Sequence, residues 1–147
     1  MADVYTAIGA APIRAEDVLA RVGDDADGAV LLFLGRVRRE HEGRRVHGMR
    51  YDTYQAMAGA VLDAIAREAA ERAGSDHIAV VHRTGELAVG EISVAIAVAT
   101  PHRAEAYEAS RYIIEQIKLR LPVWKHEHYT AGDSRWLEGA VPPGSAS

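Results

Sequence analysis

The 147-residue chain contains no cysteine. This absence excludes disulfide bonds, thiolate zinc sites, iron–sulfur clusters and a cysteine nucleophile. Aromatic residues are also scarce, at 6% of the chain, which disfavours nucleic-acid binding by base stacking. If this protein carries out sulfur chemistry, the sulfur must therefore arrive on another molecule.

Several signals of localisation and of common enzyme classes are missing as well. No apolar run approaches the roughly 18 residues of a membrane span, and the N-terminus has no pattern of a secretory signal. We therefore expect a soluble, cytoplasmic protein that does not associate with membranes. The chain has no G-x-G-x-x-G, P-loop, G-x-S-x-G or H-E-x-x-H motif, so nucleotide hydrolysis and serine-hydrolase chemistry lack their usual signatures.

The composition is that of one ordinary globular domain, with 48% hydrophobic and 26% charged residues. We expect a single domain over residues 1–138. The last residues, 139–147, are small and rich in proline and glycine, and we expect them to form a flexible tail.

Hydrophobic periodicity predicts the order β-α-β-β-α-β-β-α-β, an α+β fold with a mainly antiparallel sheet. The predicted strands are residues 4–8, 29–37, 46–54, 78–82, 92–99 and 123–129, and the predicted helices are 13–22, 57–73 and 102–121. The segment 29–37 is continuously apolar, which favours a buried central strand. The link 83–91 contains two glycines and is expected to be a turn or short excursion.

The formal net charge is −4, but positive charge is concentrated locally. Residues 36–45 hold five arginines and two glutamates, a net +3, which leaves −7 for the rest of the chain. A basic patch on an acidic protein indicates a small anionic ligand or a negative partner surface.

Arg36 and Arg38 lie two residues apart at the end of a predicted strand, so both could face one anion. Phe33 would then lie on the opposite face, unless Gly35 disturbs the alternation. His102 and Arg103 follow Pro101 at a predicted helix start, where backbone N–H groups favour anions. For each of these pairs, simple exposure to solvent is the alternative reading.

Lys118 and Lys125 flank the break at Leu121-Pro122. Lys118 lies one helical turn after Ile114, and a lysine near an apolar wall can act as a base or nucleophile, or can hold a phosphate. The alternative is a pair of exposed structural lysines.

His126 and His128 form an H-x-H pair on a predicted strand, so they could share a face and bind a metal. No third ligand is apparent, because Glu127 would face the other way. A structural role for the two histidines is therefore favoured, and no metal or cofactor is expected.

Ordered blocks along the chain resemble the large, catalytic subunit of molybdopterin synthase. The blocks are GAVLLFLGRVR at 28–38, YDTYQAMA at 51–58, VVHRTGEL at 80–87 with GE at 90–91, PHRAEAYEA at 101–109 and IKLRLPVWKHE at 117–127. The resemblance implies an α/β hammerhead-type fold with a small antiparallel subdomain.

The resemblance also implies partners and an activity. The partners are a second copy of this chain and a small ubiquitin-like sulfur carrier that ends in Gly-Gly, together a heterotetramer. The carrier's C-terminal thiocarboxylate would give its sulfur to cyclic pyranopterin monophosphate and so form the dithiolene of molybdopterin.

Matching positions imply roles for individual residues. They imply catalysis by Lys118 and Lys125; substrate binding by Arg36, Val37, Arg38, His102, Arg103, His126 and Glu127; and a pocket for the partner's tail at Phe33 and Ile114.

Three rival readings remain open from the sequence. The first is an anion- or nucleic-acid-binding module built on residues 36–45. The second is a non-catalytic scaffold, in which the two lysines would be exposed and far apart. The third is a metal-dependent phosphohydrolase using His126 and His128.

Overall fold

A computed structural model describes residues 4–130 and 134–136 of the chain. Its helices are α1 (Ala15–Leu19), α2 (Gln55–Ala73) and α3 (Arg103–Arg120). Its strands are β1 (Tyr5–Gly9), β2 (Ala29–Arg36), β3 (Glu40–His41), β4 (Arg44–Thr53), β5 (Ile78–Arg83), β6 (Gly85–Ala88), β7 (Ile92–Thr100), β8 (Val123–Tyr129) and β9 (Ser134–Trp136). The expected tail, 139–147, lies outside the described residues.

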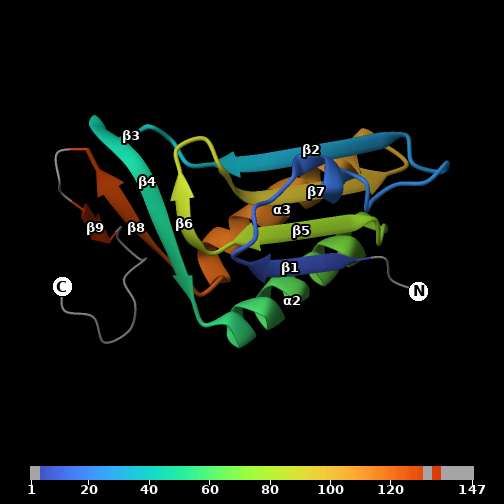
Figure 1. Ribbon diagram of the computed structural model, residues 1–147. Coiled ribbons are helices and arrows are strands. Elements are labelled where there is room, and N and C mark those ends of the chain that lie inside the picture. Colours follow the sequence, from blue (N-terminus) through green and yellow to red (C-terminus); the bar gives the residue numbers. More distant parts are fainter. Residues whose placement is uncertain (1–3, 131–133, 137–147) are drawn as a thin grey trace.

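The larger body of the molecule is a four-stranded sheet in the order β1-β5-β7-β2. β1 pairs in parallel with β5, and the other two pairings are antiparallel. α2 and α3 pack on one face of this sheet, and α1 covers part of the other face (Figure 1). Since β7 is covered on both faces, its sequence ISVAIAVAT is almost continuously apolar.

A second, five-stranded antiparallel sheet stands beside the first (Figure 1). Its strands run in the order β3-β4-β8-β9, and β6 also pairs with β4. Its small core consists of Val37, Met49, Tyr51 and Leu87. Val123, at the start of β8, packs against both this core and the larger helix-covered core, so it joins the two sheets.

The α+β prediction is confirmed, and each predicted strand and helix is present. One prediction about placement is wrong: residues 29–36 form an edge strand of the sheet, and the central strands are β5 and β7. The exposed fraction of Val30, 51%, reflects this edge position. The apolar run indicated burial, but such a run does not reveal whether a neighbour lies on both sides.

The sequence reading missed three short strands and extended one helix too far. β3, β6 and β9 are two to four residues long, too short to show an alternating pattern. β6 occupies part of the link 83–91 that was expected to be a turn. α1 spans only Ala15–Leu19 and not 13–22, and the acidic segment after Gly23 cannot extend it.

Gly28 is required by a close backbone approach, because a Cβ atom there would lie 2.6 Å from the carbonyl oxygen of Pro101. We expect Gly28→Ala to lower the free energy of unfolding by about 1–3 kcal/mol. Gly59→Ala is the matched control: it lies within α2, has nothing within 4 Å of its Cβ position, and should stabilise by about 0.5–1 kcal/mol. Urea unfolding of both variants measures the contrast, and equal effects would contradict it.

Candidate functional site

A lysine of helix α3 and a lysine of strand β8 meet where the larger body joins the second sheet. Lys118 lies in the last turn of α3, which ends because Leu121 takes an extended conformation before Pro122. Lys125 lies three residues into the strand region that follows, on β8. Their amino groups lie close enough that Lys118 lowers the pKa of Lys125. The short break between helix and strand therefore brings together two cations that are seven residues apart in the sequence.

This contact changes the acid–base behaviour of Lys125. Burial, the adjacent Lys118 and the charge of Arg38 together lower the pKa of Lys125 to about 8, against the opposing charge of Glu127. Lys118 is exposed at the surface. Two neighbouring ammonium groups repel each other, which favours the loss of one proton. Lys125, the more buried of the two, is the amine that can lose its proton near neutral pH.

Glu127 shares the inward face of β8 with Lys125. Alternation along the strand places Lys125, Glu127 and Tyr129 on this face. It is the same face of the sheet on which Met49 and Tyr51 of the small core lie. The Glu127 side chain is almost fully buried and accepts a hydrogen bond of 2.7 Å from the Tyr129 hydroxyl. His41 Nδ1 lies 4.0 Å from the same carboxylate. Glu127 thus supplies a fixed negative charge beside the two lysines.

A buried polar floor lies beneath the lysines, and the sequence reading missed it. Tyr51 lies directly opposite Lys125 in the β4–β8 register, and its ring meets the His82 ring edge-on at 5.4 Å. The Tyr51 side chain also hydrogen-bonds to Ser93, whose hydroxyl donates to the Gly35 carbonyl at 3.2 Å. Residues of four different strands converge here.

His82 is neutral within this floor. Burial, together with the charges of Lys125 and Lys118, lowers its pKa to about 4, and a hydrogen bond to the carbonyl oxygen of Arg83 opposes this shift. The bond joins Nδ1 to that oxygen at 2.9 Å, so Nδ1 carries the proton of the neutral ring. A neutral imidazole adds no third positive charge beneath the lysine pair.

The three residues at the end of β2 do not act as one group. Arg38 lies close enough to Lys125 to lower its pKa, so it is placed where a cation could bind the same substrate. Arg36 instead donates from Nε to the carbonyl oxygen of Gly90 at 3.0 Å. Val37 is buried in the core of the second sheet, and its N–H and C=O groups bond to Glu91 and Gly90. Arg36 and Arg38 therefore lie in different surroundings, and the binding of one anion by both stays a prediction.

Phe33 and Ile114 both lie on the helix side of the larger sheet. Leu31 of β2 packs against the helix-covered core, and Phe33, two residues further, points to the same face. Ile114 of α3 packs against that core one helical turn before Lys118. Phe33 remains 36% exposed, so an apolar surface lies open on the side of the sheet from which α3 leads to Lys118.

His102 and Arg103 lie at the other end of α3. They line a hollow of about 450 Å³ together with Gly28, Ala29, Pro101 and Ala104. The carbonyl oxygen of His102 accepts a hydrogen bond from the Thr100 hydroxyl at 2.6 Å. Arg103 and Lys118 are 15 helical residues apart, or about 22 Å along the axis. Within one chain, this pair and the lysines cannot hold the same small molecule.

His126 also lies apart from the lysines. It is on the outward face of β8, together with Trp124 and His128, whereas Lys125 and Glu127 face inward. The structure therefore does not bring His126 to the substrate site that the resemblance implied. Elsewhere among the described residues, Asp24, Asp27 and His77 have potential metal-ligand atoms within 4.8 Å of one another.

The arrangement bears on the rival readings. A scaffold would have exposed lysines far apart, and here the two are in contact over a buried floor. The basic segment 36–45 forms the β3–β4 hairpin and lacks an aromatic residue for stacking on bases. Within the part of the chain that the structure describes, no helix is long and apolar enough to cross a membrane.

Comparison with known proteins gives the family. The model of the MoaE protein family matches residues 8–120. The molybdopterin synthase catalytic subunit of Synechococcus elongatus is 45% identical over 130 residues, covering 88% of this chain and 79% of that protein. The corresponding subunit of Halalkalibacterium halodurans is 42% identical over 122 residues, covering 83% and 78%. The chain belongs to the MoaE family.

Solved structures agree with this assignment. The crystal structure of molybdopterin synthase from Staphylococcus aureus matches with a TM-score of 0.83 and 36% identity, covering 88% of this chain and 94% of that one. A molybdopterin biosynthesis MoaE protein from Burkholderia ambifaria matches with a TM-score of 0.73 and 26% identity, covering 96% and 93%. The two-sheet arrangement is thus the fold of this family.

Because the pKa of Lys125 is lower in the folded chain than the ordinary 10.5, holding it protonated costs stability. We expect Lys125→Met to raise the free energy of unfolding by about 1–3 kcal/mol below pH 8. The gain should shrink as the pH rises from 8 to 10.5. Lys125 is already neutral in the folded wild-type chain over this range, and it becomes neutral in the unfolded chain as the pH approaches 10.5. Urea unfolding at several pH values measures it.

Arg111→Met is the control, because it removes an exposed cation of α3 and should give no such pH-dependent gain. A Lys125→Met variant that is destabilised at pH 7, or stabilised equally at every pH, would contradict the assignment of a buried, easily deprotonated lysine.

Proposed function

We propose that this chain is the catalytic subunit of a molybdopterin synthase and acts as a sulfurtransferase. In this proposal, sulfur passes from the C-terminal thiocarboxylate of a small ubiquitin-like subunit to cyclic pyranopterin monophosphate, in the biosynthesis of the molybdenum cofactor. The observation that carries the proposal is the contact of Lys118 with Lys125 over a buried polar floor, with Arg38 alongside. Membership of the MoaE family, and the name of its relatives, support it.

The charges suit the proposed reaction. Both the thiocarboxylate and the cyclic phosphate are anions, and this acidic chain gathers three cations in one place. Opening a cyclic phosphate creates further negative charge, which fixed cations stabilise at little reorganisation cost. The chain contains no cysteine, so sulfur carried by a separate subunit is consistent with its composition.

The two lysines have different roles in this proposal. Lys118 is exposed at the end of α3 and meets the substrate as an ammonium ion, where it stabilises charge during the attack on the thiocarboxylate-linked intermediate. Lys125 lies deeper and accepts a proton from Lys118 when it is neutral. Glu127 favours the charged form of Lys125 and offsets its charge, and the neutral His82 adds no further positive charge.

His102 and Arg103 join this site only if a second copy supplies them. Within one chain they are about 22 Å from Lys118 along α3. In the homodimer that we propose, the phosphate-binding His102–Arg103 pair of one copy faces the lysine pair of the other. This arrangement gives two equivalent composite sites per dimer, as two-fold symmetry requires.

The partner's tail is proposed to enter along Phe33 and Ile114. Both residues lie on the helix side of the larger sheet, and Ile114 is one turn from Lys118. A narrow tail that ends in glycine can approach a backbone more closely than any other, because it has no Cβ atom. With one small subunit at each end of the dimer, the assembly is a heterotetramer.

Replacement of Lys118 tests the proposal directly. We expect Lys118→Ala to reduce dithiolene formation at least about a hundredfold, because the reaction loses its principal charge stabiliser. The assay combines this chain, a thiocarboxylated small subunit and cyclic pyranopterin monophosphate. Small-subunit binding by the variant, measured by calorimetry, shows that its fold is intact. Normal turnover in Lys118→Ala would exclude the proposed role.

Mixing two inactive variants tests the composite site. Lys118→Ala removes the lysine part of the composite site, and Arg103→Ala removes its phosphate-binding part. In a dimer with one copy of each variant, one site lacks both parts and the other site is intact. Random pairing then restores about a quarter of wild-type activity, since half of all dimers are mixed. If each site lies within one chain, the mixture stays as inactive as its components, and the dimeric arrangement is wrong.

A further inference from the structure

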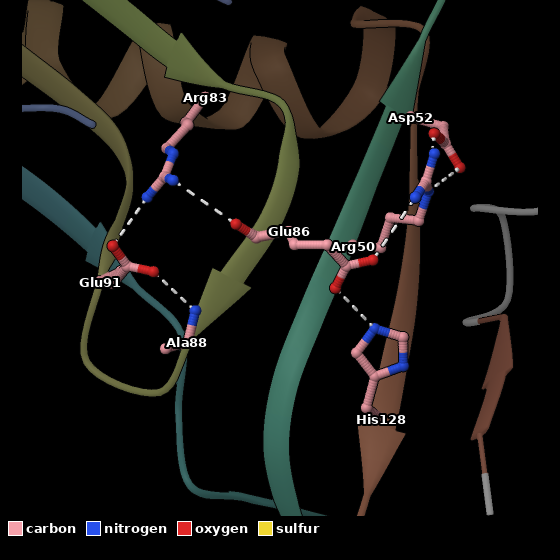
Figure 2. A network of polar contacts seen from close by, with 7 residues as sticks. All are labelled: Arg50, Asp52, Arg83, Glu86, Ala88, Glu91 and His128. Carbon is pink, nitrogen blue, oxygen red and sulfur yellow. Dashed lines mark hydrogen bonds and ion pairs between the residues drawn. The ribbon is translucent and has the colours of Figure 1, made fainter. Parts of the chain in front are cut away.

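An ion pair between Arg83 and Glu91 lies beside the end of β2 (Figure 2). Arg83 Nη1 donates to Glu91 Oε2 at 2.9 Å, and the N–H of Ala88 donates to Glu91 Oε1 at 2.7 Å. The Ala88 N–H and the Arg83 guanidinium lower the pKa of the Glu91 carboxyl, so this group is ionised at neutral pH. The Arg83 side chain is only 12% exposed, and its Nε donates to the carbonyl oxygen of Ala10 at 3.2 Å.

Glu91 closes a tight turn over residues 88–91. Its N–H donates to the carbonyl oxygen of Ala88 at 3.1 Å, and its carboxylate accepts the Ala88 N–H. Gly90, the third residue of the turn, has a φ of 88°, in the left-handed region that favours glycine. Both backbone groups of Ala88 are thus held by Glu91, and Arg83 anchors Glu91 from outside the turn. The conformation of the turn therefore depends on the ion pair.

This turn holds the end of β2. Gly90 donates its N–H to the carbonyl oxygen of Val37 at 2.8 Å, and the N–H of Val37 donates to the carbonyl oxygen of Glu91 at 3.0 Å. Arg36 Nε also donates to the Gly90 carbonyl oxygen. The β2–β7 register shifts between Gly35 and Arg36, and β2 ends at Arg36. Beyond that point the backbone of Val37 is bonded to the turn, so the turn sets its position.

Val37 immediately precedes Arg38, the arginine that lowers the pKa of Lys125. On the other side of Arg38, the carbonyl oxygen of Arg39 accepts the N–H of Val46 of β4 at 2.7 Å. The backbone of Arg38 is therefore held from both sides, by the turn and by β4. Because its side chain starts from a fixed backbone position, less conformational entropy is lost when the guanidinium stays beside Lys125.

Arg83 also supports the floor beneath the lysines. Its carbonyl oxygen accepts the Nδ1–H of His82 at 2.9 Å, which fixes the orientation of that neutral ring. Arg83 thus holds the His82 ring with its backbone and the 88–91 turn with its side chain. The floor and the segment that carries Arg38 are both anchored at this residue.

We propose that Arg83 and Glu91 are positioning residues for the sulfur transfer: their ion pair holds the 88–91 turn, which fixes Val37 and so keeps the Arg38 guanidinium beside Lys125 to bind the anionic substrate. Neither Arg83 nor Glu91 touches the substrate. The identity of the substrate rests on the proposed function, whereas the position of Arg38 does not.

The position of Arg38 is tested without any substrate. The chain contains two lysines, so isotope labelling of lysine gives two side-chain NMR signals, and Lys118→Arg identifies the signal of Lys125. Its titration should show a raised pKa in Arg38→Ala, because the charge of Arg38 lowers it. We expect Glu91→Ala to raise this pKa too, and to add no further rise in the Arg38→Ala background. Loss of a negative charge by itself lowers the pKa of a lysine, so a rise cannot be a direct charge effect.

Substrate binding is tested with the thiocarboxylated small subunit. We expect Glu91→Ala and Arg83→Met to raise the KM for cyclic pyranopterin monophosphate about three- to tenfold and to change kcat less than about twofold, because the bound state and the transition state lose the same charge-assisted contact. Glu91→Gln keeps an acceptor for the Ala88 N–H but loses the charge opposite Arg83, so its KM should lie between those of wild type and Glu91→Ala. In the Arg38→Ala background, Glu91→Ala should leave the KM unchanged.

Glu86→Gln is the matched control, because it removes a carboxylate from the same network (Figure 2). Glu86 contacts His128 Nε2 at 2.9 Å and Arg50 Nη1 at 3.5 Å, on the face of the second sheet opposite to Lys125. This variant should leave both the KM and the pKa of Lys125 unchanged. Urea unfolding checks that every variant is folded.

A Glu91→Ala variant with either an unchanged KM or an unchanged pKa of Lys125 would overturn the proposal, as would effects of Glu91→Ala and Arg38→Ala that simply add. An equal rise of the KM in Glu86→Gln would also overturn it, because the loss of any nearby carboxylate would then suffice. If the wild-type chain forms no dithiolene, the proposed function fails, and the titration of Lys125 alone decides whether the ion pair positions Arg38.

Discussion

The contact between Lys118 and Lys125 is the constraint on which the site depends. Two ammonium ions side by side, partly removed from water, repel each other, so one of them must give up its proton readily. Burial and the neighbouring cations lower the pKa of Lys125 to about 8, which makes the contact tolerable near neutral pH. Such a pair can hold an anion with one charged amine and release a proton from the other.

The surrounding residues are consistent with this constraint. Glu127 supplies a buried negative charge that offsets part of the positive charge of the lysine pair, and His82 stays neutral and adds none. The remaining surface of the chain is acidic, with a net charge of −4 in all, and does not compete for anions. The cluster of Lys118, Lys125 and Arg38 is therefore a local concentration of positive charge that favours anionic substrates.

Much of the fold and part of the site could be predicted from the sequence. The Leu121-Pro122 break explains how Lys118 and Lys125 meet, and the proline makes this break predictable from the sequence. Tyr51, His82 and Ser93 were missed because their convergence depends on pairing between strands that are distant in sequence. Pairing of that kind follows from tertiary packing, for which local patterns give no signal.

The same reason explains why one strand was assigned the wrong position in its sheet. Residues 29–36 read as central because they are apolar, yet only strand order could show that β2 is an edge. Val123 touches both cores, and along the chain it lies between Lys118 of α3 and Lys125 of its own strand β8. The distance between the lysines is therefore set by how the two sheets are seated on each other. The pKa of Lys125, which depends on the nearness of Lys118, therefore depends on how the two sheets pack together.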